Sequence, residues 1–389
     1  MAPLPERAHD SASEHESYLE SSVIAGRQDS SVDKLRTERR NRGRGATLNP
    51  TGRFEALSHH VFDDGWQTLQ DLPAFSTKVV VEKAKSIITR NESPDISFDR
   101  SINPYRGCEH GCIYCYARPA HAFMGLSPGT DFETNIFAKP NSAKLLRREL
   151  AKKGYKPRTL ALGANTDPYQ PIEKQWRITR EILEVLEATN HPVGIVTKSA
   201  LVTRDIDILS RMAEKGLAKV ALSITTLDRK LARLMEPRAS TPALRLKAVR
   251  DLTRAGIPTA VMTAPMIPAL NDHEMERILD SAKAAGAESA GFILLRLPRE
   301  VSPLFRDWLL QHYPDRYRHV MNLLRAMRNG KDYDAEFGKR LRGDGPYAWQ
   351  IKRRFELACK KLGLNETHRH LKRNLFTPPV EAADQLTLF

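Results

Sequence analysis

Short β-branched or aliphatic runs alternate with longer amphipathic segments from Thr159 onward, and this alternation limits the possible fold more than any other feature of the chain. The runs that predict strands cover residues 159–163, 193–197, 219–224, 259–264 and 291–295. The patterns that predict helices lie between them, over residues 174–188, 203–215, 242–255 and 272–285. Strands and helices that alternate in this way form βα units around a parallel sheet.

One further unit precedes these, with a strand predicted over residues 97–103 and a helix over residues 142–153. The resulting six βα units fall short of the eight that close a TIM barrel. The predicted fold class is therefore α/β, with a partial (β/α)6 TIM-type barrel. A chain of 389 residues has room for one such domain together with appendages.

Composition divides the remainder of the chain. Residues 1–50 are rich in Ser, Glu, Asp and Arg and contain few aromatic residues, which predicts a disordered tail. The arginine-rich run at residues 39–44 could contact nucleic acid, although a solvated charge run is the commoner explanation. We expect an N-terminal lead-in over residues 51–95, the barrel over residues 96–298 and a helical C-terminal extension over residues 299–389.

Three of the four cysteines, Cys108, Cys112 and Cys115, fall in one short loop after the first predicted strand. Three thiolates are too few for a four-ligand metal site, but they can hold three corners of a cubane [4Fe–4S] cluster and leave the fourth iron open. Gly107 and Gly111 permit positive φ and a close approach of the backbone, so amide N–H groups can point at the cluster sulfides.

A zinc site is the alternative interpretation of this loop, because zinc also binds three cysteines together with one histidine, here His110 or His121. Structural zinc sites usually contain two ligand pairs separated by a long spacer, and the sequence contains no second pair. The fourth cysteine, Cys359, lies in a predicted helix and is expected to be a small buried hydrophobic residue. The spacing therefore favours the cluster.

The cysteines also indicate a compartment. The sequence contains no even set of spaced cysteines, no recognisable signal peptide and no apolar run long enough to cross a bilayer. We expect a protein of a reducing compartment, located in the cytoplasm and without a membrane partner.

The Cys-x3-Cys-x2-Cys spacing, with the aromatic residue Tyr114 before the last cysteine, resembles the signature of radical S-adenosylmethionine (SAM) enzymes. It is most similar to the spore photoproduct lyase-like branch, often labelled DNA repair photolyase, and the resemblance covers about residues 101–297. The resemblance implies a [4Fe–4S] cluster whose open iron binds SAM, with Tyr114 at the cofactor. It further implies reductive cleavage of SAM to a 5′-deoxyadenosyl radical that abstracts hydrogen from a substrate, and an electron donor such as a flavodoxin or ferredoxin.

Residues that follow the strands of a parallel barrel converge on one mouth. The polar segment 163–171 follows the second strand, and its residues alone indicate capping and Asx-turns. The resemblance implies instead that Thr166 and Asp167 contact the methionine moiety of SAM. It likewise implies that Lys198, otherwise an ordinary surface lysine, binds the SAM carboxylate. Ser223, which could simply bond its own backbone, becomes a contact to ribose or methionine.

Two positions bear on the reaction itself. In the lyase of this family a cysteine at the end of the second strand returns hydrogen to the product radical, but the matching position here is Ala164, and residues 162–166 contain no cysteine. Tyr116 resembles a tyrosine of the lyase's hydrogen relay and is the predicted catalytic residue, although a tyrosine there could simply pack. The resemblance therefore predicts a lyase-like enzyme whose exact reaction is open.

The C-terminal extension is strongly basic. Residues 314–373 contain 16 Lys and Arg against 7 Asp and Glu, so they contribute +9 of the net charge of +14. Interspersed aromatic side chains could stack on bases while the cations contact phosphates, which makes DNA and RNA candidate substrates. Packing of the aromatic residues against the barrel explains the pattern equally well. A metal-stabilised nucleic-acid-binding protein without turnover is therefore the alternative function.

Overall fold

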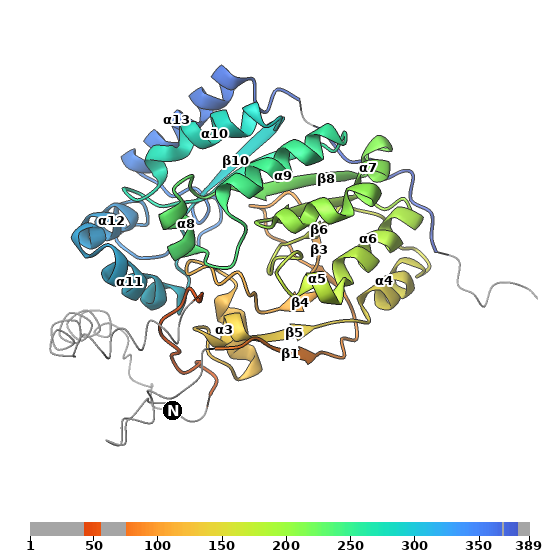
Figure 1. Ribbon diagram of the computed structural model, residues 1–389, viewed down its shortest axis with the longest axis horizontal. Coiled ribbons are helices and arrows are strands. Elements are labelled where there is room, and N and C mark those ends of the chain that lie inside the picture. Colours follow the sequence, from red (N-terminus) through yellow and green to blue (C-terminus); the bar gives the residue numbers. More distant parts are fainter. Residues whose placement is uncertain (1–42, 56–74, 368, 380–389) are drawn as a thin grey trace, which may run out of the picture. The chain divides into compact units, whose positions relative to one another are not determined.

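The computed structural model describes residues 43–55, 75–367 and 369–379, and its central element is a seven-stranded sheet of order β10-β9-β8-β7-β6-β3-β2 (Figure 1). Six neighbouring strands run parallel, and β2 (Ile88–Arg90) pairs antiparallel with β3 at one edge. The parallel strands are β3 (Arg100–Ile102), β6 (Leu160–Leu162), β7 (Val193–Thr197), β8 (Ala218–Ser223), β9 (Thr259–Met266) and β10 (Ser289–Leu294).

The register of the sheet brings the carboxyl ends of its strands together. Leu162 lies opposite Ile195, and Ser223 lies opposite Met262, so the residues that follow neighbouring strands emerge along the same edge. Within the described residues the sheet does not close, since β10 and β2 remain its two edges. The predicted partial barrel of six parallel strands is confirmed.

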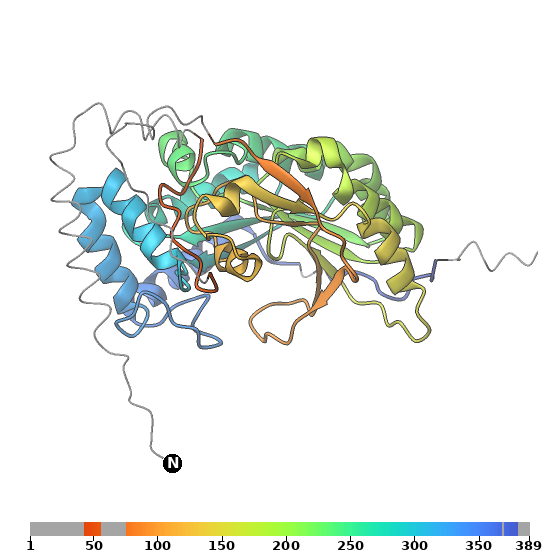
Figure 2. The same cartoon turned by 90° about the horizontal axis from the view of Figure 1, so that it is seen from below.

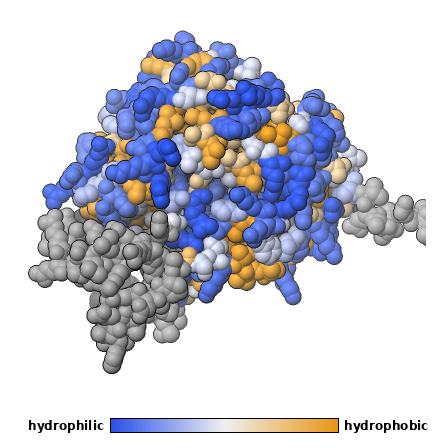
Figure 3. Space-filling view, viewed as in Figure 1, coloured by the Kyte–Doolittle hydropathy of each residue, from blue (hydrophilic) through white to orange (hydrophobic). Residues whose placement is uncertain are grey.

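Helices connect the strands and cover the outer face of the sheet (Figures 1 and 2). In α6 the buried residues recur every three or four positions, as in Ile178, Ile182 and Val185, and this stripe faces the sheet. The polar sides face outward, and in Figure 3 apolar groups on the viewed face are interspersed with hydrophilic ones. The connecting helices are α4 (Ser142–Leu150), α6 (Ile178–Ala188), α7 (Ile206–Glu214), α9 (Pro242–Arg254) and α10 (Met275–Ala284).

Three of the predicted helices begin with a separate short turn. The short helix α5 (Glu173–Trp176) is separated from α6 by Arg177, whose φ of 52° interrupts the helix. The 3-10 turns η4 (Ala200–Asp205) and η5 (Asp272–Glu274) precede α7 and α10. The helix periodicity in the sequence did not separate these turns from the helices that follow them.

A second, three-stranded sheet of order β1-β5-β4 was not predicted. It consists of β1 (Lys78–Val81), β5 (Asn135–Ala138) and β4 (Tyr105–Arg106). Strand β4 leads directly into the cysteine loop, so this sheet fixes where the loop begins. The turn η3 (Arg118–Met124) and the short helix α3 (Asp131–Thr134) follow the loop.

The C-terminal extension is helical, as predicted, and consists of α11 (Val301–His312), α12 (Pro314–Ala326) and α13 (Pro346–Leu362). Trp308 and Phe305 of α11 are completely buried in an apolar cluster that also contains Ile113 of the cysteine loop. The extension therefore packs against the predicted site. Another short helix, α8 (Arg229–Met235), contributes to the same cluster.

The segment between α12 and α13 contacts both edges of the open sheet. The amide of Leu294 in β10 donates to the carbonyl of Leu341 at 2.9 Å. Arg340 donates to the carboxylate of Asp95, which lies shortly after β2, at 2.6 Å. This segment therefore joins β10 to the residues that follow β2.

The predicted disordered tail lies outside the described residues as far as residue 42. Its last residues are described and are not disordered, since Arg44, Gly45 and Ala46 are buried against the residues that follow the cysteine loop. A polar composition predicted disorder because it does not reveal distant hydrogen-bond partners. None of the described helices is long and apolar enough to span a bilayer.

Candidate active site

Two glycines shape the cysteine loop. Gly107 and Gly111 have φ values of 75° and 65°, which favour glycine. A Cβ at Gly107 would lie 2.9 Å from the carbonyl oxygen of Phe132, and a Cβ at Gly111 would lie 2.6 Å from the carboxylate of Glu133. The predicted positive φ is confirmed, whereas an approach of these amides to cluster sulfides stays a prediction. The Gly111 amide donates to the carbonyl of Cys108 at 3.3 Å, so it stabilises the turn of the loop itself.

The three cysteines of the loop are free thiols that lie close to one another. Cys108 and Cys112 are buried, and Cys115 is partly exposed. Burial raises the pKa of all three thiols, and the carboxylates of Asp167 and Glu236 add to this effect at Cys108 and Cys112 respectively. Buried thiols become thiolates when metal ions compensate their charge. The donor set therefore fits a cationic group such as an iron–sulfur cluster.

The histidines that could complete a zinc site are engaged elsewhere. His110 Nδ1 lies 3.4 Å from Asp167 Oδ2, and His121 Nε2 lies 3.0 Å from the carbonyl oxygen of Asn135. Within the described ranges, no group of three or more His, Cys, Asp and Glu side chains is arranged to hold a single metal ion. Zinc needs its ligands at about 2.0–2.3 Å, whereas a cubane spreads its thiolates over separate iron atoms. Because both histidines have other partners, the loop offers three thiolates, which is the number that a cubane with one open iron takes.

Asp167 lies at the mouth and joins two strand ends to the loop. Its carboxylate accepts hydrogen bonds from Thr197 Oγ1 at 2.7 Å, from the Lys198 amide at 2.8 Å and from the Tyr169 amide at 2.9 Å. Burial alone would raise the pKa of Asp167, but His110 and these donors outweigh burial and lower the pKa to about 2. Asp167 is therefore an anion that organises the mouth, and its contact with SAM stays a prediction.

Thr166 and Ser223 are both buried at strand ends, as predicted. The hydroxyl of Thr166 donates to the carbonyl of Tyr105 at 2.9 Å, so it anchors β4 just before the cysteine loop. The carbonyl of Ser223 accepts a hydrogen bond from Arg245 at 2.9 Å. Their roles as SAM contacts also stay predictions.

Lys198 follows β7 and faces the cysteine loop. Its Nζ lies 3.7 Å from Glu236 Oε1 and 5.6 Å from the centre of the Tyr114 ring, and its side chain is only 16% exposed. Burial lowers the pKa of Lys198, whereas the nearby thiol of Cys112 acts in the opposite direction. Lys198 lies directly after β7, and its contact with the SAM carboxylate stays a prediction.

Glu236 is the residue that the sequence did not reveal. This fully buried carboxylate accepts hydrogen bonds from the hydroxyl of Tyr114 and from Thr225, the latter at 2.6 Å, and forms an ion pair with Arg245. It lies between α8 and α9, and no motif in that segment indicates a buried charge. Tyr114 therefore contributes its hydroxyl to a polar network rather than leaving it free for a cofactor.

Tyr116, the predicted catalytic residue, lies on the open side of the loop and is 44% exposed. Its hydroxyl donates to the carbonyl of Ala164, the position where the resemblance implied a cysteine. The guanidinium of Arg296, which follows β10, lies 4.3 Å from the centre of the Tyr116 ring. The mouth therefore combines a phenol with a cation.

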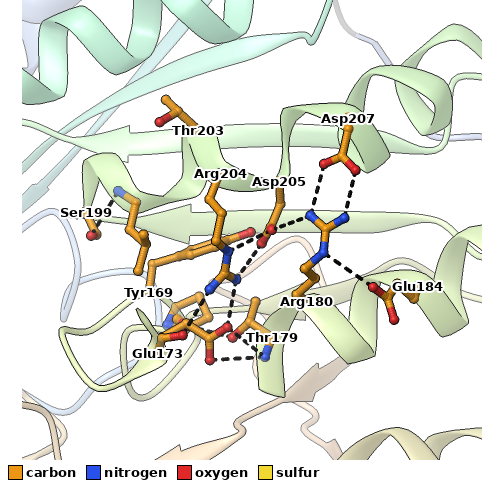
Figure 4. A network of polar contacts seen from close by, with 12 residues as sticks. Tyr169, Glu173, Thr179, Arg180, Glu184, Ser199, Thr203, Arg204, Asp205 and Asp207 are labelled. Carbon is orange, nitrogen blue, oxygen red and sulfur yellow. Dashed lines mark hydrogen bonds and ion pairs between the residues drawn. The ribbon is translucent and has the colours of Figure 1, made fainter. Parts of the chain in front are cut away.

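A network of polar contacts around Glu173 and Arg204 (Figure 4) is linked through Tyr105 to the start of the cysteine loop. The carboxylate of Glu173 accepts hydrogen bonds from the hydroxyl of Tyr105 and from Arg204, the latter at 2.8 Å. Nearby, the side chain of Gln170 accepts from the Glu109 amide at 2.9 Å and donates to the Gly107 carbonyl at 3.3 Å, so it bridges the residues on both sides of Cys108. Figure 4 also shows Asp205, which joins Arg204 to Arg180, and Asp207, which binds the same arginine.

Comparison with known proteins identifies the family. The sequence profile of the radical SAM superfamily matches residues 102–282. An uncharacterized protein of Mycobacterium tuberculosis is 36% identical over 230 residues, which cover 58% of this chain and 68% of that protein. The radical SAM Nα-GlyT isomerase of Pseudomonas phage M6 is 27% identical over 187 residues, covering 47% of this chain and 36% of the isomerase.

Among solved structures, spore photoproduct lyase complexed with dinucleoside spore photoproduct has the same fold. The TM-score is 0.54 and the sequence identity is 18%, and the match covers 74% of this chain and 80% of the lyase. The cysteine loop, the open parallel sheet and these matches agree. The chain belongs to the radical SAM superfamily.

Proposed function

We propose that the protein is a radical SAM enzyme in which Cys108, Cys112 and Cys115 bind a [4Fe–4S] cluster. The observation that carries this proposal is a loop of three free cysteines at the carboxyl ends of parallel strands, with the ammonium of Lys198 facing it. The bound cluster and SAM would supply a 5′-deoxyadenosyl radical that abstracts hydrogen from the substrate. The protein supplies binding, orientation and charge.

Lys198 is the proposed partner of the SAM carboxylate. The Glu236 carboxylate near it already accepts hydrogen bonds from three other side chains, so Lys198 retains donors for a second anion. Thr166, Asp167 and Ser223 are proposed to line the methionine and ribose positions, since the first two follow β6 and Ser223 ends β8, on the two sides of β7. Tyr114 would form a fixed wall, because its hydroxyl is held by Glu236.

Tyr116 is the proposed hydrogen-relay residue. Its half-exposed ring lies beside the cysteine loop, and its hydroxyl reaches the carbonyl of Ala164. The absence of a cysteine at residues 162–166 is a reason to assign the relay to the phenol. This assignment makes the protein lyase-like in its machinery without fixing its reaction.

A nucleic acid is the proposed substrate class. Support comes from the basic extension, from the exposed Phe337 and Trp349 within it, and from Arg296 at the mouth. Arg296 stacks on the Tyr116 ring, and although its charge also acts on Asp95, its guanidinium is proposed to meet a phosphate at the mouth. The structure of spore photoproduct lyase with a dinucleoside photoproduct supports the same class. A flavodoxin or ferredoxin would deliver the electron.

Anaerobic reconstitution tests the proposal. We expect brown protein that absorbs broadly in the visible range and forms 5′-deoxyadenosine from SAM when it is reduced. Cys112→Ala should abolish this product, whereas Cys359→Ala, which changes a buried cysteine in α13, should retain it. Colourless protein that carries one tightly bound zinc would reject the proposal.

The alternative is a metal-stabilised nucleic-acid-binding protein without turnover, and the basic extension is the observation that favours it. In that case DNA and RNA binding should weaken steeply with salt while SAM remains intact under reducing conditions. Deuterium transfer from a labelled oligonucleotide into 5′-deoxyadenosine would exclude this alternative.

A further inference from the structure

Residues 44–50, here called the N-terminal strap, lie directly across the cysteine loop. The amides of Gly45 and Ala46 donate to the two carboxylate oxygens of Glu133, at 2.9 and 2.8 Å respectively. The guanidinium of Arg44 donates to the backbone carbonyl of Glu133 at 2.9 Å. One residue that follows the cysteine loop therefore holds three consecutive residues of the strap.

The same carboxylate holds the cysteine loop. Glu133 is fully buried and forms an ion pair of 2.5 Å with Arg118, which is also fully buried. Arg118 donates in turn to the carbonyls of Cys112 at 3.0 Å and Gly111 at 3.3 Å. Since Arg118 and Glu133 are charged groups without access to water, breaking one partner of this pair would cost far more than an exposed ion pair. The strap and the loop therefore share one rigid anchor.

The strap touches the loop backbone to backbone. A Cβ at Gly45 would lie 1.7 Å from the carbonyl oxygen of Gly111, so any side chain there must displace the loop or the strap. Ala46 is completely buried in the apolar cluster that contains Cys112 and Ile113. At its far side the strap is fastened to α11, because Thr47 donates to the carboxylate of Asp307 at 2.5 Å.

We propose that the N-terminal strap is a positioning element that fixes the cysteine loop in the geometry required for cluster binding and shields the Cys112 thiol from solvent. Gly45 is the position at which the strap acts, and Glu133 transmits the contact to Cys112 through Arg118. The requirement for this geometry rests on the proposed cluster. The shielding and the geometry are properties of the chain itself, and they are measurable without iron or SAM.

Thiol alkylation of the full-length protein, kept reduced and free of iron, is the test. Iodoacetamide is added, and peptide mass spectrometry follows each cysteine separately. In Gly45→Ala, Cys112 should react at least about tenfold faster than in the wild type, because the strap no longer closes over it. Cys359 should react at an unchanged rate, since it lies buried in α13. Gly194→Ala is the matched control, because a Cβ there meets nothing closer than 3.8 Å.

Equal Cys112 rates in Gly45→Ala and the wild type would overturn the proposal. If Cys359 also reacts faster, Gly45→Ala has lost its fold and Thr47→Val decides instead. That variant removes the Thr47 hydroxyl, which bonds Asp307 and Gln311 of α11, and it should raise the Cys112 rate by a smaller factor while leaving Cys359 unchanged. If Thr47→Val does not raise the Cys112 rate selectively, the proposed role of the strap is rejected. These results are separate from SAM cleavage, so the strap and the proposed function can fail independently.

Discussion

The ammonium of Lys198 lies 3.7 Å from a carboxylate oxygen of Glu236, in a mouth that also contains the thiol of Cys112. Glu236 is already bonded to Tyr114, Thr225 and Arg245, so Lys198 is its most distant partner. The lysine is thus held in place by a charge that it does not fully neutralise. This arrangement suits a residue that must meet a second carboxylate.

Replacing Lys198 with Met should weaken SAM binding on the order of tenfold to a hundredfold, because a hydrogen bond to a charged group is worth about 1.5–3 kcal/mol. Isothermal titration of the reconstituted protein with SAM measures the effect. Lys219→Met, which changes an exposed lysine of β8, should bind SAM like the wild type. Equal affinities of the two variants for SAM would show that Lys198 does not bind SAM.

Glu236→Gln should lower the free energy of unfolding by about 3 kcal/mol, because it leaves Arg245 buried without its counter-charge. Urea unfolding of the iron-free protein gives this number. Glu184→Gln removes a carboxylate that is 51% exposed and pairs with Arg180, and it should cost less than about 1 kcal/mol. Similar losses of unfolding free energy in both variants would show that the contacts of Glu236 contribute no more than those of an exposed carboxylate.

The two tyrosines of the cysteine loop should respond differently to loss of their hydroxyls. Tyr114→Phe breaks a buried bond to Glu236 and should cost about 1–2 kcal/mol of stability. Tyr116→Phe removes a half-exposed hydroxyl and should cost less than about 0.5 kcal/mol. Urea unfolding of both variants checks this order, and the reverse order would contradict it. Tyr116→Phe should still form 5′-deoxyadenosine.

Stability should depend on pH through His191, which is fully buried between Tyr155 and Phe376. Burial lowers its pKa to about 4, and Arg100 adds to this, although a contact with the Pro192 carbonyl opposes it. The unfolded chain, with its ordinary pKa of 6.5, takes up the proton first. The stabilisation is therefore present above about pH 6.5 and is lost as the pH falls towards about 4, by about 2–3 kcal/mol.

Urea unfolding at pH 7.5 and pH 4.5 measures this loss, and His191→Gln should show a smaller loss because its side chain does not titrate. Other groups titrate in both proteins, so the difference between them is the relevant quantity. An identical loss in wild type and variant would show that His191 does not contribute to it.

Arg296→Gln should weaken binding of a short single-stranded DNA and reduce the slope of log K against log salt by about 1, because one phosphate contact is lost. Fluorescence anisotropy at several salt concentrations measures the slope. The exposed Arg254, at the end of α9, provides the control variant Arg254→Gln. SAM cleavage without DNA should be unchanged in both. If Arg296→Gln has the same slope as the wild type, the DNA does not contact Arg296.

The barrel was predictable because each of its strands and helices has a local pattern. The strand predicted over 193–197 and β7 have the same bounds, since Val193, Ile195 and Thr197 are buried along one run. The three-stranded sheet was not predictable, because β4 has only two residues and joins β5 about 30 positions along the chain. Short strands of this kind are defined by their partners.

The site residues also divide into those that a local sequence pattern marks and those that depend on distant partners. The three cysteines stand out in the sequence because they lie in one loop, and Lys198 because it follows a recognisable strand; their roles at a cofactor stay predictions. Glu236 could not, since its partner Tyr114 lies 122 positions away. The strap was misread for the same reason, because Glu133, which accepts the Gly45 amide, lies 88 positions away. The amino-acid composition of these segments gives no indication of either contact.

The bond between Thr47 and Asp307 joins residues that are 260 positions apart. During synthesis, the strap can bind Glu133 as soon as residue 133 is available, but its contact with α11 must wait until residue 307 has been made. The last contact that holds the strap therefore forms only after all seven strands of the open sheet have been synthesised. Truncation before α11 would leave the strap without this second contact.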